Sequence, residues 1–198
     1  MFLDVNTLLV VNAANVLITA AALPVIMGRK LSPAAAHARA ALMVQAAAWV
    51  AILLSGLWPE QWPDQLLSTV SIACTGVSQW LLFRALQGWL GPRRGGIMLT
   101  LLVILTPVGY AALFYSYPLR VGWSNGLMAL QMLIVGAATL RPRLDHGGNW
   151  RWVVLVCAWT MAGFTASRGH YGLPGLPSCT RPLRRPTRST CGPWSPPT

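Results

Sequence analysis

Acidic residues are almost missing from this sequence, and charge of either sign is scarce. Its 198 residues include four Asp and Glu, and only 10% are charged, whereas soluble domains are about a quarter charged. So little charge does not suit the surface of a soluble domain. A hydrophobic content of 55% and a mean hydropathy of +0.52 indicate a membrane protein instead.

Cysteine is also scarce, and its positions argue against a metal centre. Cys74 and Cys157 fall inside apolar runs, where a thiol acts as a small hydrophobic group. Cys179 and Cys191 lie near the C-terminus with no histidine between them, which is not a zinc pattern. We therefore expect no metal ligands and no disulfide framework, and a Cys179–Cys191 pair in an oxidising compartment stays open.

Groups that could carry out chemistry are absent from the long apolar runs. All acids and histidines lie outside them, at Asp4, Glu60, Asp64, Asp145, His37, His146 and His170. Proton relays, haem sites and coupled transporters need such side chains at membrane depth, and covalent catalysis needs a nucleophile beside a base. We expect no catalytic residue, no cofactor and no enzyme activity in this chain.

Long apolar runs are what the sequence does contain. A helix needs about 20 residues to cross a hydrocarbon core of about 30 Å, and the runs cover residues 8–27, 40–58, 66–83, 97–114, 123–140 and 152–168. The sixth run is short and spans only with tilt or bilayer thinning. The predicted fold is all-α, a polytopic transmembrane bundle of five to six helices over residues 1–167.

The second helix is predicted to begin before its apolar run. Ser32 is a good N-cap residue, and Pro33 suits the first helical position because that position needs no N–H donor.

Basic residues are unevenly divided between the loops. Nine fall in or beside the first, third and fifth loops, at Arg29, Lys30, Arg39, Arg84, Arg93, Arg94, Arg141, Arg143 and Arg151, and one, Arg120, falls in the others. This asymmetry predicts cytoplasmic odd-numbered loops and an N-terminus outside. The net charge of +11 therefore indicates membrane topology, with the lipid bilayer as partner, and no nucleic acid.

The first apolar run carries a polar stripe. Asn12, Asn15 and Thr19 recur at i, i+3 and i+7, which places them on one helix face. Amides in hydrocarbon seek partners, so the stripe is expected to face the bundle and either join helices or line a polar sensing cavity. Candidate partners in other runs are Gln45, Gln79 and Gln131.

Two prolines lie inside predicted spans. Pro24 and Pro107 each remove a backbone N–H donor and are expected to kink their helices. Each kink is interpreted as a packing adjustment or as a hinge.

Four stretches resemble the amino-terminal membrane region of bacterial GGDEF-domain proteins, which are diguanylate cyclases. They read MFLDVNTLLVVNAANV, LSPAAAHARAALMVQAAAWVAILLSGLWP, WLLFRALQGWLGP and YSYPLRVGWSN, and the resemblance covers about residues 1–168. It implies a bacterial inner-membrane location and a sensory or anchoring input region that controls cyclic di-GMP synthesis. The sequence has no GGDEF or GGEEF loop and no seventh apolar span, so no catalytic, GTP-binding or Mg²⁺ residue is carried over.

The expected function is therefore that of a membrane-embedded input region truncated before its catalytic output domain, alone or as a homo-oligomer. Two alternatives remain. One is a small transporter or channel for a neutral solute, and the other is a non-catalytic membrane assembly partner.

Residues 168–198 differ sharply from the rest of the chain. They hold five arginines, seven prolines and no acid, a composition that predicts a disordered basic tail. Six crossings from an outside N-terminus would put this charge on the outer side, against the pattern of the loops. We interpret the segment as out-of-frame translation, which reading the gene in its other frames past codon 167 tests. The alternative is an external basic arm that binds anionic lipids or cell-wall polymers.

Overall fold

The computed structural model describes residues 5–27, 32–58, 61–140 and 150–171. These residues form six helices and no strand, which confirms the all-α prediction. The helices are α1 (Val5–Met27), α2 (Pro33–Ser55), α3 (Trp62–Leu90), α4 (Gly96–Ala112), α5 (Tyr117–Ala137) and α6 (Trp150–Tyr171). Helix α6 continues to Tyr171, past the end predicted for the sixth helix at residue 168, and the remainder of the predicted tail lies outside the described residues.

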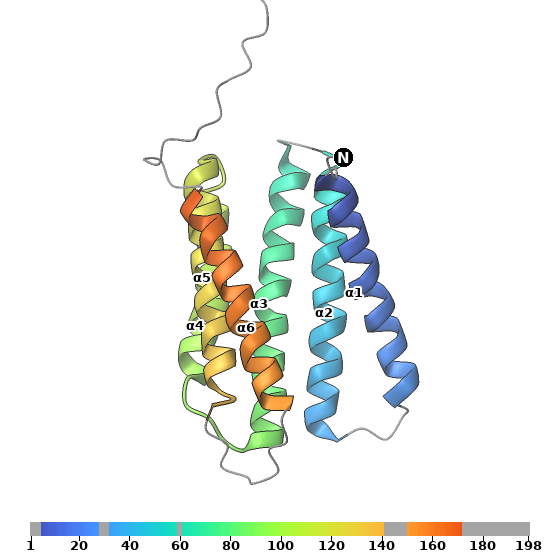
Figure 1. The fold of residues 1–198 in the computed structure, drawn as a ribbon. Coiled ribbons are helices and arrows are strands. Elements are labelled where there is room, and N and C mark those ends of the chain that lie inside the picture. Colours follow the sequence, from blue (N-terminus) through green and yellow to red (C-terminus); the bar gives the residue numbers. More distant parts are fainter. Residues whose placement is uncertain (1–4, 28–31, 59–60, 141–149, 172–198) are drawn as a thin grey trace, which may run out of the picture.

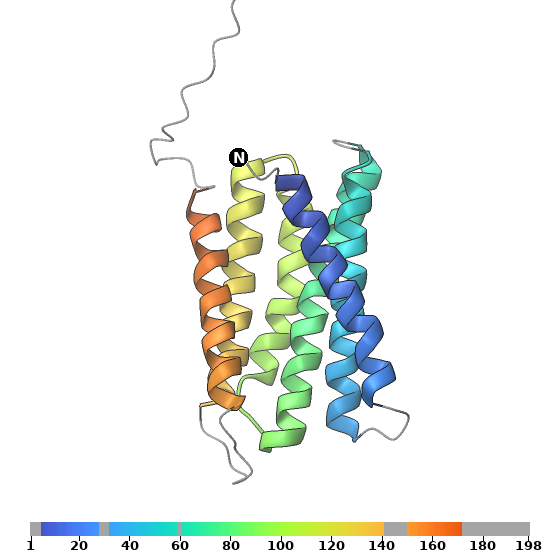
Figure 2. The same cartoon turned by 45° about the vertical axis from the view of Figure 1, so that its right-hand side comes forward.

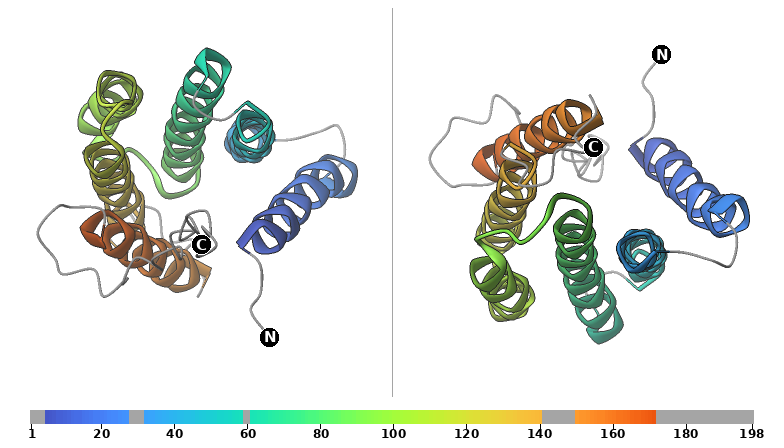
Figure 3. Two further views of the ribbon diagram at one scale, coloured as in Figure 1. Left: turned by 90° about the horizontal axis from the view of Figure 1, so that it is seen from above. Right: turned by 90° about the horizontal axis from the view of Figure 1, so that it is seen from below.

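The helices run up and down along one direction, each antiparallel to the one before it (Figure 1, Figure 2). Seen end on, they form an open arc with α1 at one end and α6 at the other (Figure 3). Each helix contacts its neighbours in the chain, and α3 also contacts α5. Among the described helices, α1 packs on α2 alone and α6 packs on α5 alone. Helix α3 is therefore the centre of the bundle.

The predicted start of the second helix is confirmed. The Ser32 side chain accepts a hydrogen bond from the Ala35 N–H at 3.3 Å, and Pro33 opens α2. Helices α3 and α5 also have a proline in their first turn, where the missing N–H donor is not needed. The turn between α3 and α4 depends on Gly91 and Gly95, whose φ angles of 89° and 109° are unfavourable for other residues.

Helix α3 is longer than its apolar run. Its 29 residues span about 43 Å at 1.5 Å per residue, so it exceeds the thickness of a hydrocarbon core. Arg84 and Gln87 interrupt the apolar run, but Phe83, Leu86 and Leu90 continue its buried face at helical spacing. The helix therefore persists to Leu90 because its inner face stays apolar.

Two of the described helices are long and apolar enough to cross a membrane, as judged by length and composition. They are α2 and α3, while α4 is apolar but has 17 residues.

Helices α2 and α3 are joined by small residues. Ala34, Ala41 and Ala48 recur every seven residues along α2, the spacing that keeps one seam against a partner helix. On α3, Ser78 bonds the Ala41 carbonyl and Ser71 bonds the Ala48 carbonyl, both at 2.8 Å. Small side chains at each of these positions let the two backbones approach closely.

Larger side chains fill the space between α3, α4 and α5. The buried cluster consists of Phe83, Leu86, Leu90, Leu99, Val135 and Ala138.

Candidate functional site

Three buried polar side chains lie on α3, α4 and α5, helices that contact one another. Gln79 lies on α3, Thr106 on α4 and Gln131 on α5, and their exposed fractions are 8%, 0% and 0%. We call these three residues the amide cluster. Burying a polar group in an apolar interior is costly unless it is hydrogen-bonded, so the partners of each atom decide what the cluster can do.

One half of the amide cluster is well bonded. The Gln131 side-chain Nε2 donates to Thr106 Oγ1 at 2.8 Å and to the Leu102 carbonyl at 3.3 Å. Thr106 Oγ1 in turn donates to the Leu102 carbonyl at 2.6 Å. These bonds tie α5 to one turn of α4.

This turn of α4 is also the one that Pro107 weakens. Proline has no backbone N–H, so the Val103 carbonyl loses its usual donor from position 107. The bonds from Thr106 and Gln131 reach the carbonyl one residue earlier, at Leu102. Pro107 therefore lies beside the point where α5 is bonded to α4.

The other half of the amide cluster is unsatisfied. Gln131 Oε1 is buried and has no hydrogen-bond partner, and the same holds for both amide atoms of Gln79. A Cβ atom on Gly76 would lie 3.6 Å from Gln131 Oε1, which places this oxygen beside α3. Gln79 lies one helical turn further along α3 from Gly76.

The unsatisfied atoms are complementary. Gln79 has two N–H donors without partners and Gln131 has an acceptor without one. A hydrogen bond from Gln79 Nε2 to Gln131 Oε1, direct or through a shared water molecule, would satisfy the Gln131 oxygen and one Gln79 donor, and Gln79 Oε1 would need a further donor. The amide cluster therefore contains hydrogen bonds between α4 and α5, and it has unpaired amide atoms on α3 and α5 that are able to form another.

The polar stripe predicted on the first helix lies apart from the amide cluster. Asn15 and Thr19 are exposed on α1, and Thr19 Oγ1 bonds the Asn15 carbonyl of its own helix at 2.8 Å. Because α1 contacts α2 alone among the described helices, these two side chains do not meet Gln79 or Gln131. The side chains of Asn12 and Pro24 lie outside the described residues.

The sequence singled out Gln79 and Gln131 as polar residues within spans and as candidate partners of the stripe on α1, together with Gln45. Among the described helices, α1 contacts only α2, the helix that carries Gln45. Thr106, the partner of Gln131, was not singled out. The signal available was its position directly before Pro107, since a hydroxyl beside a helix-breaking proline often bonds the preceding turn.

Arg120 lies against three aromatic rings at the end of the bundle that contains the α4–α5 turn. The Arg120 guanidinium carbon lies 4.5 Å from the Phe114 ring centroid, 5.3 Å from that of Tyr110 and 5.6 Å from that of Tyr117. Cation–π contacts of this kind stabilise a cation in an apolar setting. These three rings therefore stabilise Arg120, the one basic residue that the sequence places outside the odd-numbered loops of the bundle.

Other chemistry is limited among the described residues. They contain no group of three His, Cys, Asp or Glu side chains able to hold a metal ion, and Cys74 and Cys157 are free thiols. Comparison with known protein families, with curated proteins and with solved structures finds no match for this chain.

Proposed function

We propose that this chain is a polytopic membrane bundle that serves as the sensory or anchoring input region of a diguanylate-cyclase-like signalling protein. The proposal joins two parts, a membrane location and a role in transmitting a signal. Each part has its own support and its own test.

The membrane location is supported by one observation above all, the inverted packing of the bundle. In the described part of the chain, twelve of the 20 buried apolar residues are alanines, whereas 31 large apolar side chains are exposed, 27 of them on the helices and some on each helix. A soluble helical bundle buries its large side chains and exposes charge. Lipid tails remove that preference, so helices in a bilayer pack through small residues and leave large ones outside.

Hydroxyl groups support the same location. Serine and threonine side chains along α2 to α6 donate to backbone carbonyls, and Ser71 and Ser78 do so across the helix interface. In hydrocarbon, where water is absent, each such bond satisfies a group that has no other partner.

The role in signalling is supported by the amide cluster. A sensor requires an element with two arrangements whose balance a stimulus can shift. Gln131 Nε2 is bonded to α4, and a bond from Gln79 to Gln131 Oε1 would join α5 to α3 as well, so the two arrangements differ in whether this second bond is made. Pro107 beside this point would let α4 bend as the second bond forms or breaks.

The membrane location is tested with topology reporters. Alkaline phosphatase fused after Trp58 or Ser116 should be active, since both sites are expected outside, and its fusion after Pro92 should be inactive. A fluorescent protein fused at the same three sites should give the reverse pattern. Active phosphatase at Pro92 with inactive phosphatase at Trp58 would invert the map, and recovery of the chain without detergent would remove the membrane location.

The signalling role is tested with a chimera in which residues 1–167 are joined through one added transmembrane helix to a GGDEF domain. Cyclic di-GMP is measured for the parent chimera and for its Gln79→Leu and Pro107→Ala variants, at matched protein levels. We expect each substitution to change the cyclic di-GMP level several-fold, because Gln79→Leu prevents the bond between α3 and α5 and Pro107→Ala makes α4 harder to bend. Equal levels in all three proteins would contradict the signalling role while leaving the membrane location intact.

A further inference from the structure

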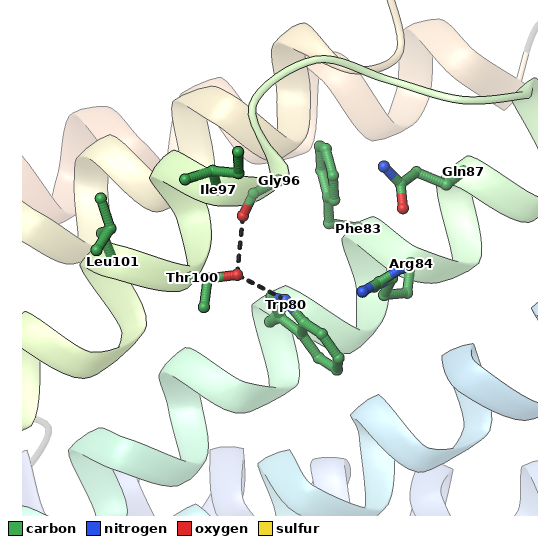
Figure 4. Close-up of a pocket in the computed structure, with 8 residues that line it drawn as sticks. All are labelled: Trp80, Phe83, Arg84, Gln87, Gly96, Ile97, Thr100 and Leu101. Atoms are coloured by element: carbon green, nitrogen blue, oxygen red, sulfur yellow. Dashed lines mark hydrogen bonds between the residues drawn. The ribbon is translucent and has the colours of Figure 1, made fainter.

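The end of the bundle that contains the α3–α4 turn holds a pocket between these two helices. Its volume is about 340 Å³. The lining residues are Trp80, Phe83, Arg84 and Gln87 from α3 and Gly96, Ile97, Thr100 and Leu101 from α4 (Figure 4). Polar side chains thus come mainly from α3 and apolar ones mainly from α4.

The polar side of the pocket is built around Trp80. Its indole Nε1 donates to Thr100 Oγ1 at 3.2 Å, and Thr100 Oγ1 donates to the Gly96 carbonyl at 2.9 Å. The Arg84 guanidinium carbon lies 4.9 Å from the centroid of the Trp80 ring. The hydrogen bond fixes the indole, and the indole positions an exposed arginine at the pocket mouth (Figure 4).

Positive charge at this end has no nearby carboxylate among the described residues. Their one acidic residue is Asp64, in the first turn of α3, and Arg84 follows it by 20 positions, or about 30 Å along the helix. Two further hollows share lining residues with the pocket. One adds His37, Gly88 and Pro92, and the other adds Arg93, Arg94, Gly95 and Met98. The three hollows therefore adjoin one another, and the exposed arginines Arg84 and Arg94 give this end of the bundle positive charge.

An apolar stripe leads away from this end of the bundle along α4. It consists of the exposed residues Ile97, Leu101, Ile104, Leu105 and Val108. Their spacing keeps them on one helix face, and they cover about 17 Å at 1.5 Å per residue. This length is close to half of the hydrocarbon thickness of a bilayer, about 15 Å.

We propose that this pocket binds an anionic phospholipid. The headgroup phosphate lies between Arg84 and Gln87, with Arg94 adding charge from the turn, and one acyl chain follows the apolar stripe of α4. Basic pockets between membrane helices bind anionic headgroups through direct charge contacts. A soluble phosphate would use the polar wall alone, and the continuous apolar stripe beside it favours a lipid. The inference rests on the proposed membrane location.

The test measures lipid binding by the full chain in a mild detergent. Dioleoylphosphatidylglycerol is titrated into the protein and the bound lipid is counted by native mass spectrometry. We expect saturable binding that is five- to tenfold weaker for Arg84→Gln, since a basic residue near an anionic headgroup contributes strongly to affinity. Arg39→Gln removes the same charge from α2, away from the lining of the three hollows, and should leave binding within twofold.

Further arms separate the ligand sources and guard against misfolding. Dioleoylphosphatidylcholine should bind at least fivefold more weakly, and inorganic phosphate or glycerol 3-phosphate should not displace the bound lipid at millimolar concentration. Arg84→Lys, which keeps the charge, should retain more binding than Arg84→Gln, and both variants should melt near the wild-type temperature. A variant that does melt early is replaced by Gln87→Ala, which should weaken binding in the same way.

Several results would overturn the inference. Equal weakening by Arg84→Gln and Arg39→Gln would mean attraction to overall charge without a site. Displacement by inorganic phosphate would mean a site for a soluble anion. A chain that extracts from membranes only with detergent but binds both lipids alike would refute this inference alone, whereas a chain recovered without detergent would refute the membrane location as well.

Discussion

Gln79 and Gln131 show how two identical side chains, both buried, acquire different roles from their partners. Gln131 Nε2 has two acceptors on α4, whereas neither amide atom of Gln79 has a partner. An unsatisfied buried polar group destabilises the fold, and its replacement by an apolar group of similar size is neutral or favourable. The two glutamines should therefore respond in opposite directions to the same substitution.

We expect Gln131→Leu to lower the free energy of unfolding by about 1 kcal/mol, the scale of an interhelical hydrogen bond in membrane proteins. Gln79→Leu should leave it unchanged or raise it. Thermal unfolding in detergent measures both, as a fall of a few degrees for Gln131→Leu and none for Gln79→Leu. An equal loss in both variants would show that the Gln79 amide is bonded.

Arg120 depends on the shape of its side chain as well as on its charge. A planar guanidinium stacks on aromatic rings, and the ammonium of lysine does so less well. We expect Arg120→Lys to lower the free energy of unfolding by about 0.5 to 1 kcal/mol, measured by the same thermal assay. Arg94→Lys is the matched control at an exposed arginine and should have no effect. If Arg120→Lys costs as much when Phe114 is replaced by Leu, the ring contact does not contribute.

At the scale of helices, the contact between α2 and α3 depends on the small residues that face each other. A Cβ atom on Gly88 would lie 2.6 Å from the Ala34 Cβ, closer than two carbon atoms can approach. The two helices are therefore in contact through their backbones at this point. No large apolar side chain is needed to hold them together.

We expect Gly88→Ala to separate α2 from α3 and to lower the free energy of unfolding by about 1 to 3 kcal/mol. Gly126→Ala is the control, because a Cβ at Gly126 has no atom within 4 Å. Adding Ala34→Gly to Gly88→Ala should restore most of the lost stability in the thermal assay. A double variant no more stable than Gly88→Ala would contradict the close contact.

Pro107 lies inside α4, directly after Thr106, which accepts a hydrogen bond from Gln131. Pro107→Ala supplies an N–H for the Val103 carbonyl, so we expect a straighter and less mobile α4. Spin labels at Met98 and Tyr115, which are exposed on either side of Pro107, should give a narrower distance distribution in the variant. The same width with proline or alanine would identify Pro107 as a packing adjustment.

Helix positions were largely predictable and helix limits were not. The pair Ser32-Pro33 predicted the start of α2 because a cap is a local feature. The end of α3 was missed because charged Arg84 and polar Gln87 ended the apolar run, while the inner face continued through Leu86 to Leu90. Hydropathy averages all sides of a helix, but a helix needs only one apolar side to continue.

At the scale of the whole molecule, the exposed surface is the property that separates a membrane bundle from a soluble one. Ile104 lies in the middle of α4 and is 59% exposed. In water, a charged residue there would be tolerated or would improve solubility. At the centre of a bilayer, it costs about 2.5 to 3.5 kcal/mol.

We therefore expect Ile104→Arg to reduce the amount of chain inserted in the membrane, measured by alkaline extraction of membranes. Tyr115→Arg is the control, since Tyr115 is also exposed but lies beyond the end of α4, where charge is readily accommodated. Normal yield and insertion of Ile104→Arg would argue that α4 does not face lipid.

The sequence by itself determined the all-α class, the approximate positions of the helices, the cap of α2 and the lack of ionisable groups in the apolar runs, because all of these are local properties of composition and spacing. Only the tertiary structure decided which polar side chains meet. Periodicity predicted that Asn15 and Thr19 share a face, but the face that a neighbour covers depends on the order of helices around the arc. When both the interior and the surroundings of a bundle are apolar, hydropathy does not distinguish one face from another, so the pairing of Gln131 with Thr106 became visible only when α4 and α5 were packed together.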